Sequence, residues 1–376
     1  MRISSTEAWV EHENRRTGRG RSASPRSRTA RPRQAEVARL AGVSQATVSL
    51  VLANKQNGVV ISDETRQKVL DAAQELGYVP DPAARSLAAA HNNLLGVFSF
   101  TSTFPTDVRH SYYPFLVGVE QEAAARGFDL VLFTGSSSGG AGAQAPEALG
   151  RVRLADGCLF LGRHIPTDQL RRFVDEGFPV VHLGRRDELE GLSWVGADYV
   201  SATREVVAHL AAAGHRRLML VRENDEAPAS TDRERGFREG LAEAGIEGEV
   251  FRSADPAEQL TAQRLRGWLD DGVTALVAEE TDTGNAWRAL LAAVRAAGLR
   301  TPADVSLALL GSPPADLASD AVPTGFDIPR KELGAAAVRL LASLVAGDPV
   351  PEPLVACTFR PGATSGPVHS TSQGVS

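Results

Sequence analysis

Residues 36–49 read EVARLAGVSQATVS and carry the most informative pattern in the chain. Apolar residues recur at helical spacing from Val37, Gly42 interrupts the helix, and Ser44 is a good N-terminal cap for a second helix. That second helix is expected to run to about Leu52. A helix, a glycine turn and a helix opening on serine predict a helix-turn-helix unit. The second helix of such a unit can enter the DNA major groove, with the side chains of its first turn at the base edges.

The start of this second helix carries side chains that suit DNA. Gln45 can form two hydrogen bonds with adenine, and Ala46 can contact a thymine methyl group. Thr47 and Ser49, together with backbone N–H groups at the start of the helix, can bind phosphate. Helix–glycine–helix units are also common as purely structural elements, so on spacing alone the structural alternative stays open.

A third helix completes a minimal helical domain over residues 34–79. It is expected to start near Ser62, to bury one apolar stripe and to end at Gly77. Residues 80–93 then contain a short alanine-rich helix whose one large apolar residue is Leu87. A helix of this length and composition is marginal by itself.

The net charge of −6 hides an asymmetry along the chain. Residues 1–33 hold nine arginines against three glutamates, a net of +6, which leaves −12 on the remainder. Because this segment lacks apolar periodicity, it is expected to be a disordered basic tail with an anionic partner. The alternative is an over-extended start site.

From Leu94 onward, apolar runs of strand length alternate with helical stretches. The expected strands are Leu94–Phe100, Phe128–Thr134, Gly157–Leu161, Pro179–Leu183, Arg217–Val221, Val250–Phe251, Thr274–Ala278 and Val305–Leu310. The expected helices are Pro114–Arg126, Thr167–Glu176, Thr203–Ala213, Arg233–Ala244, Gln259–Asp270 and Trp287–Ala297. This alternation predicts doubly wound parallel sheets with helices on both faces. About 270 residues is long for one such sheet, so two similar lobes are expected.

Several classes of protein are disfavoured. Cys158 and Cys357 lie far apart in sequence and fit neither a disulfide framework nor a metal site, which favours a reducing cytoplasm. The sequence contains no run of 18 apolar residues, so a membrane span is not expected. A secretory signal is not expected either, because no apolar segment follows the N-terminal arginines. No nucleophile elbow, phosphate loop or metal-binding histidine pair occurs, so neither a catalytic residue nor a cofactor is expected. His209 and His215 are expected to be structural.

The order of residues in the headpiece resembles the lactose-repressor family of bacterial transcription regulators. The matching headpiece strings are Ala41-Gly42-Val43-Ser44, Thr47-Val48-Ser49, Thr65-Arg66, Leu76-Gly77-Tyr78-Val79-Pro80 and Ala84-Arg85-Ser86-Leu87. Downstream, the resemblance continues to about Gly362 through Tyr113-Pro114-Phe115, Ala155-Asp156-Gly157, His209-Leu210, Gly214-His215-Arg216-Arg217, Arg233-Glu234-Arg235-Gly236-Phe237, Pro302-Ala303-Asp304-Val305-Ser306 and Leu333-Gly334. It implies an N-terminal all-α helix-turn-helix headpiece followed by an α/β two-lobed domain like periplasmic binding proteins.

The resemblance also implies how DNA is read. Gln45, Ala46 and Leu50 match base-reading positions. Leu87 matches a leucine that wedges into the minor groove at the centre of the operator and kinks the duplex; simple packing is its alternative role. The full set of implied DNA contacts is Ser44, Gln45, Ala46, Thr47, Ser49, Leu50, Asn54, Ser62, Arg85 and Leu87. Family members bind pseudo-palindromic sites as dimers.

The headpiece departs from the family pattern at some positions. Leu50 stands where a long polar or basic residue is frequent, and Ala53 where Asn is usual, with Asn54 adjacent. Residues 34–90 carry a net charge of −1, so their affinity for the phosphate backbone is expected to be modest. The hypothesis is that the basic tail at residues 1–33 supplies additional affinity for the phosphate backbone.

In this family a small effector binds in the cleft between the lobes. The implied effector-binding residues are Tyr113, Phe115, Asp198, Arg233 and Asp282. Arg233 matches through its Arg-x-x-Gly-Phe spacing, and its planar guanidinium can grip hydroxyls or a carboxylate. Core packing is the alternative for the two aromatic residues, and a surface ion pair with Glu234 or Asp232 is the alternative for Arg233.

The cleft also departs from the family. After the expected strand at Thr274–Ala278 the family has Asn-Asp, whereas residues 279–285 of this chain read EETDTGN, which leaves the register open. Asp282 is taken as the substitute for the family's aspartate. After Val305-Ser306 the family has glycine, an aromatic residue and aspartate. In this chain residues 309–314 read LLGSPP and contain no acidic residue. A non-sugar effector, or none, is therefore an alternative to an ordinary hexose.

The expected organisation combines these elements. It comprises a disordered tail at 1–33, a headpiece at 34–79, a hinge helix at 80–93, an effector-binding and dimerisation domain at 94–365 and a frayed tail at 366–376. Within the effector-binding domain, lobe 1 is expected at about 94–197 and 325–352, and lobe 2 at about 198–324 and 353–365. The expected function is that of a cytoplasmic, nucleoid-associated transcriptional regulator that acts as a repressor. It binds a double-stranded DNA operator as a homodimer and responds to a sugar or similar polar metabolite, with no membrane partner. The alternatives are a regulator with lost or non-sugar sensing and, more distantly, a solute-binding protein of a transporter.

Overall fold

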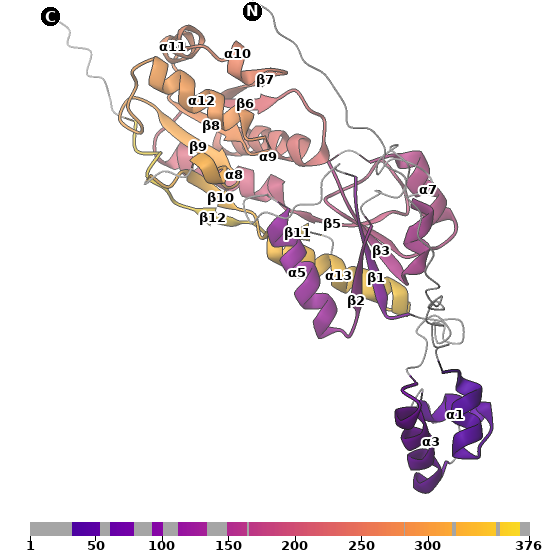
Figure 1. The fold of residues 1–376 in the computed structure, drawn as a ribbon. Helices are drawn as coiled ribbons and strands as arrows, with labels where there is room; N and C mark the ends of the chain where they lie inside the picture. The colour runs from indigo at the N-terminus through magenta and orange to yellow at the C-terminus, as the bar shows by residue number, and fades with distance from the viewer. Residues whose placement is uncertain are drawn as a thin grey trace, which may run out of the picture. The chain divides into compact units, whose positions relative to one another are not determined.

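The chain forms two compact units, Met1–Ala88 and Ala89–Ser376 (Figure 1). The structure, a computed structural model, describes residues 32–52, 61–78, 92–100, 112–133, 149–163, 165–281, 283–317, 321–350 and 354–368. The expected basic tail, apart from its last two residues, and nearly all of the expected hinge helix lie outside the described residues. The same holds for four expected site residues, Asn54, Arg85, Leu87 and Asp282.

The first unit is a small helical bundle made of α1 (Gln34–Ala41), α2 (Gln45–Leu52) and α3 (Asp63–Glu75). The three expected helices are confirmed. Gly42 has a left-handed backbone with φ of 67°, a conformation that glycine adopts without steric cost, and it ends α1 so that the chain can turn into α2. The core of this unit is formed by Val37, Ala38, Val48, Val51, Val69, Ala72 and Ala73.

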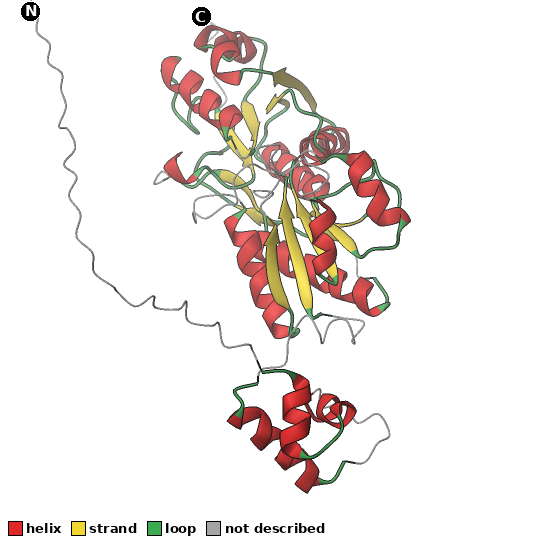
Figure 2. Ribbon diagram, turned by 45° about the vertical axis from the view of Figure 1, so that its right-hand side comes forward, coloured by secondary structure: helices red, strands yellow, loops and turns green. Residues whose placement is uncertain are grey.

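The second unit begins with a parallel sheet. Its strands are β1 (Leu94–Ser99), β2 (Asp129–Phe133), β3 (Gly157–Leu161), β4 (Val180–Leu183), β5 (Ser193–Ala197) and β11 (Leu354–Val355), in the order β2-β1-β3-β4-β5-β11. Helices α5 (Tyr113–Ala125) and α13 (Arg330–Ala346) pack on one face, and α7 (Thr167–Asp175) packs on the other (Figure 2). Successive residues of β1 alternate between these faces: Val97 joins the α5–α13 core, whereas Phe98 joins the α7 core.

A second sheet has a similar strand order. Its strands are β6 (Arg217–Glu223), β7 (Glu247–Ser253), β8 (Ala275–Glu279), β9 (Ser306–Leu310), β10 (Thr324–Asp327) and β12 (Thr358–Arg360), in the order β7-β6-β8-β9-β10-β12. β12 runs antiparallel to β10, and the other pairs are parallel. One face carries α8 (Tyr199–Ala212) and α9 (Pro228–Ala244), and the other carries α10 (Pro256–Gln259), α11 (Ala262–Asp270) and α12 (Asn285–Ala296). Short 3-10 turns lie at Arg151–Leu154 and Ala315–Leu317.

The two doubly wound parallel sheets confirm the expected fold class, and several elements differ in detail. Four strands were not expected: β5, β10 and β12 contain glycine, polar residues or both, and β11 has only two residues. The single helix expected at Gln259–Asp270 is two helices, since the Thr261 hydroxyl accepts a hydrogen bond from Arg264 N at 3.2 Å and caps a new start. Helix α9 begins at Pro228, a residue suited to a first helical turn, and not at Arg233.

The expected lobe boundaries need correction by a few residues. Thr324–Asp327 pairs in the second sheet, although residues from 325 were expected in lobe 1. Leu354–Val355 pairs with β5 in the first sheet, although residues from 353 were expected in lobe 2. The expected fraying from Gly366 is also wrong for its first residues, because Val368 N donates to Ala213 O at 3.1 Å. The composition of these segments signals a loop and cannot reveal such backbone pairing.

Helices α5 and α13 cross in close backbone contact. A Cβ atom on Gly118 would overlap the carbonyl oxygen of Lys331, and one on Gly334 would overlap the carbonyl oxygen of Phe115. Only glycine at both positions allows this approach. The crossing therefore fixes the first turns of both helices against each other, and those turns line the cavity described next.

Candidate functional site

The start of α2 is held by a serine cap. The Ser44 hydroxyl accepts a hydrogen bond from Thr47 N at 3.1 Å and lies 2.9 Å from the Thr47 hydroxyl. This cap satisfies one of the N–H groups that a helix start leaves unpaired. The hydroxyls of Ser44 and Thr47, both expected DNA contacts, therefore hold each other in a defined position at the start of the helix.

The expected reading face of α2 is turned away from the core of its unit. Val48 and Val51 are buried. Gln45, Ala46 and Ser49 are exposed, whereas Leu50 is half-buried. The helix thus presents a polar face with a hydrogen-bonding amide and a small apolar side chain, which is the chemistry that base edges and thymine methyl groups need. Ser62, another expected DNA contact, caps α3 by accepting from Thr65 N at 3.3 Å.

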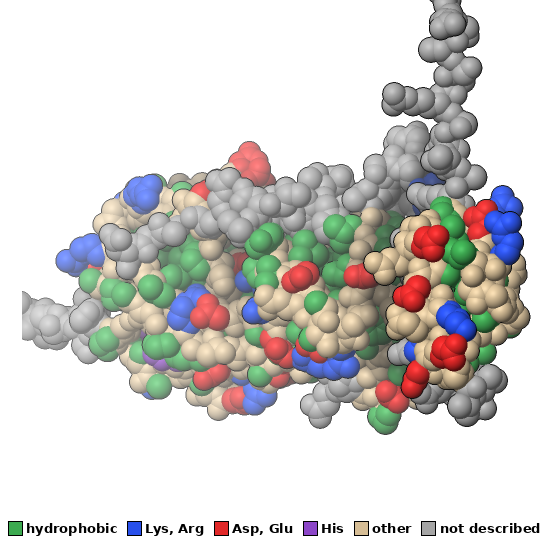
Figure 3. Space-filling view, turned by 60° about the horizontal axis from the view of Figure 1, so that its bottom comes forward, with side chains coloured by type: hydrophobic (Ala, Val, Ile, Leu, Met, Phe, Trp, Pro, Cys, Tyr) green, Lys and Arg blue, Asp and Glu red, His purple; other side chains and the backbone are tan. Residues whose placement is uncertain are grey.

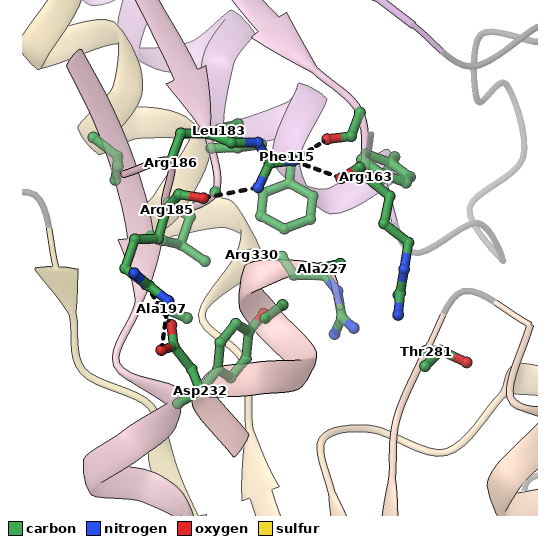
Figure 4. A pocket seen from close by; sticks show the side chains of 18 of the residues that line it. Phe115, Arg163, Leu183, Arg185, Arg186, Ala197, Ala227, Asp232, Thr281 and Arg330 are labelled. Carbon is green, nitrogen blue, oxygen red and sulfur yellow. Dashed lines mark hydrogen bonds and ion pairs between the residues drawn. The ribbon is translucent and has the colours of Figure 1, made fainter. Parts of the chain in front are cut away.

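A cavity of about 120 Å³ lies between the two lobes of the second unit (Figure 4). Its charged lining residues are Arg163, Arg185, Arg186, Arg233, Arg330, Asp232 and Glu280. Its aromatic lining residues are Tyr112, Phe115 and Tyr199. These residues follow the carboxyl ends of β3, β4 and β8 or belong to the starts of α5, α8, α9 and α13. Ligands bind at this edge of doubly wound sheets because strand ends and helix starts converge there.

Two arginines of the first lobe reach across to acidic residues of the second. Arg185 donates from Nε and Nη2 to the two carboxylate oxygens of Asp232, at 2.7 and 2.8 Å. Arg163 donates to Asp225 through Nε and to the Ser230 hydroxyl through Nη2, the latter at 2.9 Å. Figure 4 shows the Arg185–Asp232 pair on one side of the cavity, with Arg163 and Arg330 between it and Thr281. These charge-assisted hydrogen bonds connect the lobes beside the cavity.

Arg233 and Arg330 share one carboxylate in the second lobe. Arg330 Nη2 lies 2.6 Å from Glu280 Oε1, and Arg233 Nη2 lies 3.4 Å from Glu280 Oε2. Arg233 also donates to the carbonyl oxygens of Leu310 and Ala229, each at 3.0 Å. Its guanidinium carbon stands 3.9 Å from the centre of the Tyr199 ring, within cation–π range. Backbone, carboxylate and ring thus fix the orientation of Arg233 at the cavity wall.

Behind Arg233, an ion cluster anchors α9 to the sheet. Glu234 accepts hydrogen bonds from Arg222 at 2.7 Å, from Arg238 at 2.9 and 3.0 Å, and from Arg252 at 2.8 and 2.9 Å. Burial by itself would raise the pKa of Glu234, but the hydrogen bonds and charges of Arg252, Arg238 and Arg222 outweigh it and hold the pKa at about 2. The carboxylate is therefore ionised at neutral pH.

A second buried carboxyl, Glu279, lies at the end of β8. It accepts from the Ser230 hydroxyl through Oε1, while Oε2 has no hydrogen-bond partner among the described residues. Arg222 and Arg163 stand 3.9 and 4.0 Å from its oxygens. Burial raises the pKa of Glu279 above its ordinary value in spite of the nearby arginines.

The structure brings together part of the expected effector site. Phe115 and Arg233 line the cavity as expected. Tyr113 is not among the lining residues, and its neighbour Tyr112 lines the cavity instead. Asp198 caps α8 by accepting from Ser201 N at 3.0 Å and is not among the lining residues. Glu280, Arg330, Arg163 and Arg185 were not expected. Three of these four directly follow or nearly follow a strand, which is the signal that could have found them.

Burial and hydrogen bonds define the surroundings of Arg233 and of the two histidines. Arg233 is 3% exposed, so a surface ion pair with Glu234 or Asp232 is excluded as its role. His215 Nδ1 lies 2.8 Å from the Thr274 hydroxyl, and His215 Nε2 lies 3.1 Å from the carbonyl oxygen of Gly366. His209 Nε2 lies 3.2 Å from the Ser365 hydroxyl. Both histidines hold the C-terminal segment against the second lobe.

Comparisons with known proteins agree with this architecture. Residues 35–81 match the model of bacterial regulatory proteins of the lacI family, and residues 207–365 match a periplasmic binding protein-like domain. The HTH-type transcriptional regulator CelR of Thermobifida fusca is 31% identical over 333 residues, which cover 85% of this chain and 94% of CelR. The catabolite control protein A of Streptococcus mutans is 29% identical over 322 residues, 82% of this chain and 90% of that protein.

Solved structures of the same kind share the fold. A complex of the transcriptional regulator CelR with cellobiose has a TM-score of 0.58 and 26% identity and covers 89% of this chain and 100% of that one. A lac repressor dimer bound to operator and the anti-inducer ONPF has a TM-score of 0.64 and 22% identity and covers 88% of this chain and 98% of that one. The chain belongs to the lacI family of bacterial regulatory proteins.

Membership of the family establishes the general activity. The chain is a DNA-binding transcriptional regulator with a helix-turn-helix domain and a periplasmic-binding-protein-like domain. Within the described part of the chain, every helix is either too short or too polar to cross a membrane.

Proposed function

We propose that this regulator is a ligand-controlled repressor, which binds a pseudo-palindromic operator as a homodimer and changes its DNA affinity when a small polar molecule enters the cleft. The observation that carries this proposal is the arginine-lined and aromatic-lined cavity between two lobes of a chain that also holds a DNA-binding headpiece. Coupling between such sites is typically worth about 1–3 kcal/mol.

The DNA-reading part of the proposal rests on α2. Its exposed face carries Gln45 and Ala46, and its start is fixed by the Ser44 cap. We assign base reading to Gln45, Ala46 and Leu50, and phosphate binding to Ser44, Thr47 and Ser49. We also assign DNA contacts to Asn54, Ser62, Arg85 and Leu87. A dimer would place two such helices in successive major grooves, one helical turn apart.

The sensing part rests on the geometry of the cleft. The bridges made by Arg163 and Arg185 connect the lobes beside the cavity, so a ligand bound there changes the free energy of lobe closure. Support also comes from CelR, a relative whose structure is described as a cellobiose complex. The CelR relationship favours a carbohydrate or a chemically similar metabolite as the effector.

A regulator without ordinary sugar sensing is the second candidate. It is favoured by residues 311–314, Gly-Ser-Pro-Pro, which follow β9 without an acidic side chain, and by the engagement of Glu280 in two ion pairs. A purified chain that binds its operator but no small molecule would favour this candidate over the first.

Genome-wide footprinting of the full chain tests the proposal. We expect protected sites that share an inverted repeat whose half-sites are spaced by about one helical turn. The footprint should lie over promoters, and occupancy there should lower transcription. Protected sites without a shared inverted repeat, or sites at which occupancy raises transcription, would contradict the repressor assignment.

A further inference from the structure

Arginines outnumber acidic residues among the described residues that line the cavity between the lobes. Among the described residues that line it, five are arginines and two are carboxylates. The outer surface differs, because acidic and basic side chains are interspersed over the face shown in Figure 3 and the whole chain has a net charge of −6. The concentration of guanidinium groups is thus a property of the cavity and does not reflect an overall basic character.

Both lining carboxylates already accept hydrogen bonds from arginines. Arg185 occupies the two oxygens of Asp232, at 2.7 and 2.8 Å. Arg330 and Arg233 occupy the two oxygens of Glu280, at 2.6 and 3.4 Å. A neutral polyol donates its hydroxyl protons to acceptors such as carboxylates, and both lining carboxylates are already engaged in ion pairs. Guanidinium groups outnumber carboxylates among the described lining residues.

The end of the cavity at Glu280 has more positive than negative charge. Arg330 and Arg233 share this one carboxylate, and their side chains are 12% and 4% exposed. The next carboxyl, Glu279, is buried and has Arg163 and Arg222 at 4.0 and 3.9 Å from its oxygens, so further guanidinium groups stand behind this end of the cavity. Charges attract more strongly where water is largely excluded. An anion is the ligand that this end of the cavity stabilises most.

The helix starts at the cavity add to this preference. Phe115, Ala229 and Arg330 belong to the first turns of α5, α9 and α13 and line the cavity. At none of these three starts, within the described residues, does a side chain cap the helix by a hydrogen bond. Helix starts carry a partial positive charge and unpaired N–H groups, which favour anions. By contrast, α8 is capped by Asp198.

We propose that the effector of this regulator is anionic: a polar metabolite with a carboxylate or phosphate group that binds between Arg330 and Arg233, beside Glu280. The non-ionic part of the ligand packs against Tyr199 and Phe115, the aromatic faces of the same cavity. This inference rests on the proposed function, because it names the chemical class of the effector. The cavity of about 120 Å³ is smaller than the roughly 300–1,000 Å³ of typical small-molecule sites, so binding widens the cleft at the lobe-bridging pairs.

Isothermal titration calorimetry of the full chain with matched ligands tests the inference. The ligands are tested in sets of three: a neutral sugar, the sugar acid derived from it and the phosphate ester of the same sugar. Inorganic phosphate alone serves as a further probe. We expect the charged members to bind, the neutral parent to bind far more weakly, and the affinity to fall as salt is added. Whether the acid or the phosphate binds more tightly identifies the source of the negative charge.

Variants on one helix separate a direct role of Arg330 from a structural one. Arg330→Gln should weaken binding of the charged ligand about 10- to 100-fold, the range for loss of a charged hydrogen-bond partner. Arg330→Lys should retain part of the affinity, because it keeps the charge. Arg339→Gln, also on α13 but paired with Glu122 of α5 and Glu332 of α13 and not among the residues that line the cavity, is the matched control and should leave binding unchanged.

Specific results would overturn the inference. These are a neutral parent that binds as tightly as its acid and phosphate, the absence of binding by every charged member, or equal effects of Arg330→Gln and Arg339→Gln. Operator binding measured in parallel by fluorescence anisotropy separates this inference from the proposed function. A charged ligand that binds without changing operator affinity would refute the proposed coupling only, whereas a neutral sugar that binds and changes operator affinity would refute the anionic effector only.

Discussion

Replacement of Glu234 by glutamine tests the ion cluster that holds α9 and, through it, the neighbouring Arg233. The carboxylate accepts hydrogen bonds from Arg222, Arg238 and Arg252. Glutamine keeps the size of the side chain but loses its charge, and its amide N–H group meets guanidinium N–H groups. The substitution should therefore loosen the attachment of α9 to β6 and β7.

The magnitude follows from the pKa of Glu234, which is about 2 in the folded chain against an ordinary value of 4.5. A gap of about 2.5 pH units corresponds to ~3.4 kcal/mol at 1.36 kcal/mol per unit. Solvent reduces this figure, because the side chains of Arg238 and Arg252 are 60% and 42% exposed. We therefore expect Glu234→Gln to lower the free energy of unfolding at pH 7 by about 1–3 kcal/mol.

The pH dependence has a definite sign. Because the folded pKa lies below the unfolded one, the stabilising contribution of Glu234 is fully present above about pH 4.5 and is lost as the pH falls towards 2. The difference between the native chain and Glu234→Gln should be constant near neutral pH and should shrink below 4.5. Urea unfolding followed by tryptophan fluorescence and circular dichroism measures it.

A matched control lies on the same helix. Glu243 pairs with Arg204 at the surface, where the two side chains are 55% and 40% exposed. Glu243→Gln should therefore cost less than about 1 kcal/mol. Equal losses for Glu234→Gln and Glu243→Gln, or a Glu234→Gln difference that does not shrink in acid, would refute the account of the cluster.

Three further predictions concern other parts of the chain. Ser44→Ala removes the cap of α2 and should lower the stability of the first unit by ~1 kcal/mol in thermal unfolding, with weaker operator binding; no loss of either would remove the cap from the account. Gly334→Ala should cost about 1–3 kcal/mol in urea unfolding because its methyl group meets the Phe115 carbonyl oxygen. Its control, Gly267→Ala, adds a methyl group in open space on α11 and should not destabilise. Deletion of residues 1–31 should flatten the slope of log Kd for DNA against log salt, and an unchanged slope would exclude the tail from phosphate binding.

The headpiece and the fold class could be predicted from sequence because their signals are local. Gly42 and Ser44 mark the turn and the cap between two helices, and apolar runs of strand length mark β1, β3 and β8. The strands β5 and β11 could not be predicted, because β5 mixes serine and glycine with apolar residues and β11 has only two residues, which pair with the distant β5. The same reason explains the misplaced lobe boundaries, where the chain crosses from one sheet to the other.

The cleft shows the same limit at the level of side chains. Arg233 could be found because its spacing to Gly236 and Phe237 is a local pattern. Arg330 and Glu280 form one ion pair, yet they are 50 residues apart in sequence. Neither residue stands in a local pattern that joins it to the other. Tertiary structure is required to reveal which charges meet.

The central claim is that the exposed face of α2 reads a specific DNA sequence, and one comparison tests it most directly. Operator affinity is measured for Gln45→Ala and for a control variant, Gln67→Ala. Gln67 lies on α3 of the same unit, and its side-chain amide donates a hydrogen bond to Asp71 at 2.8 Å. Each variant is titrated with the operator found by footprinting and with unrelated DNA of equal length. We predict that Gln45→Ala loses about 1–3 kcal/mol of discrimination between the two DNAs and that Gln67→Ala loses none. Equal discrimination by Gln45→Ala and the native chain would contradict the claim.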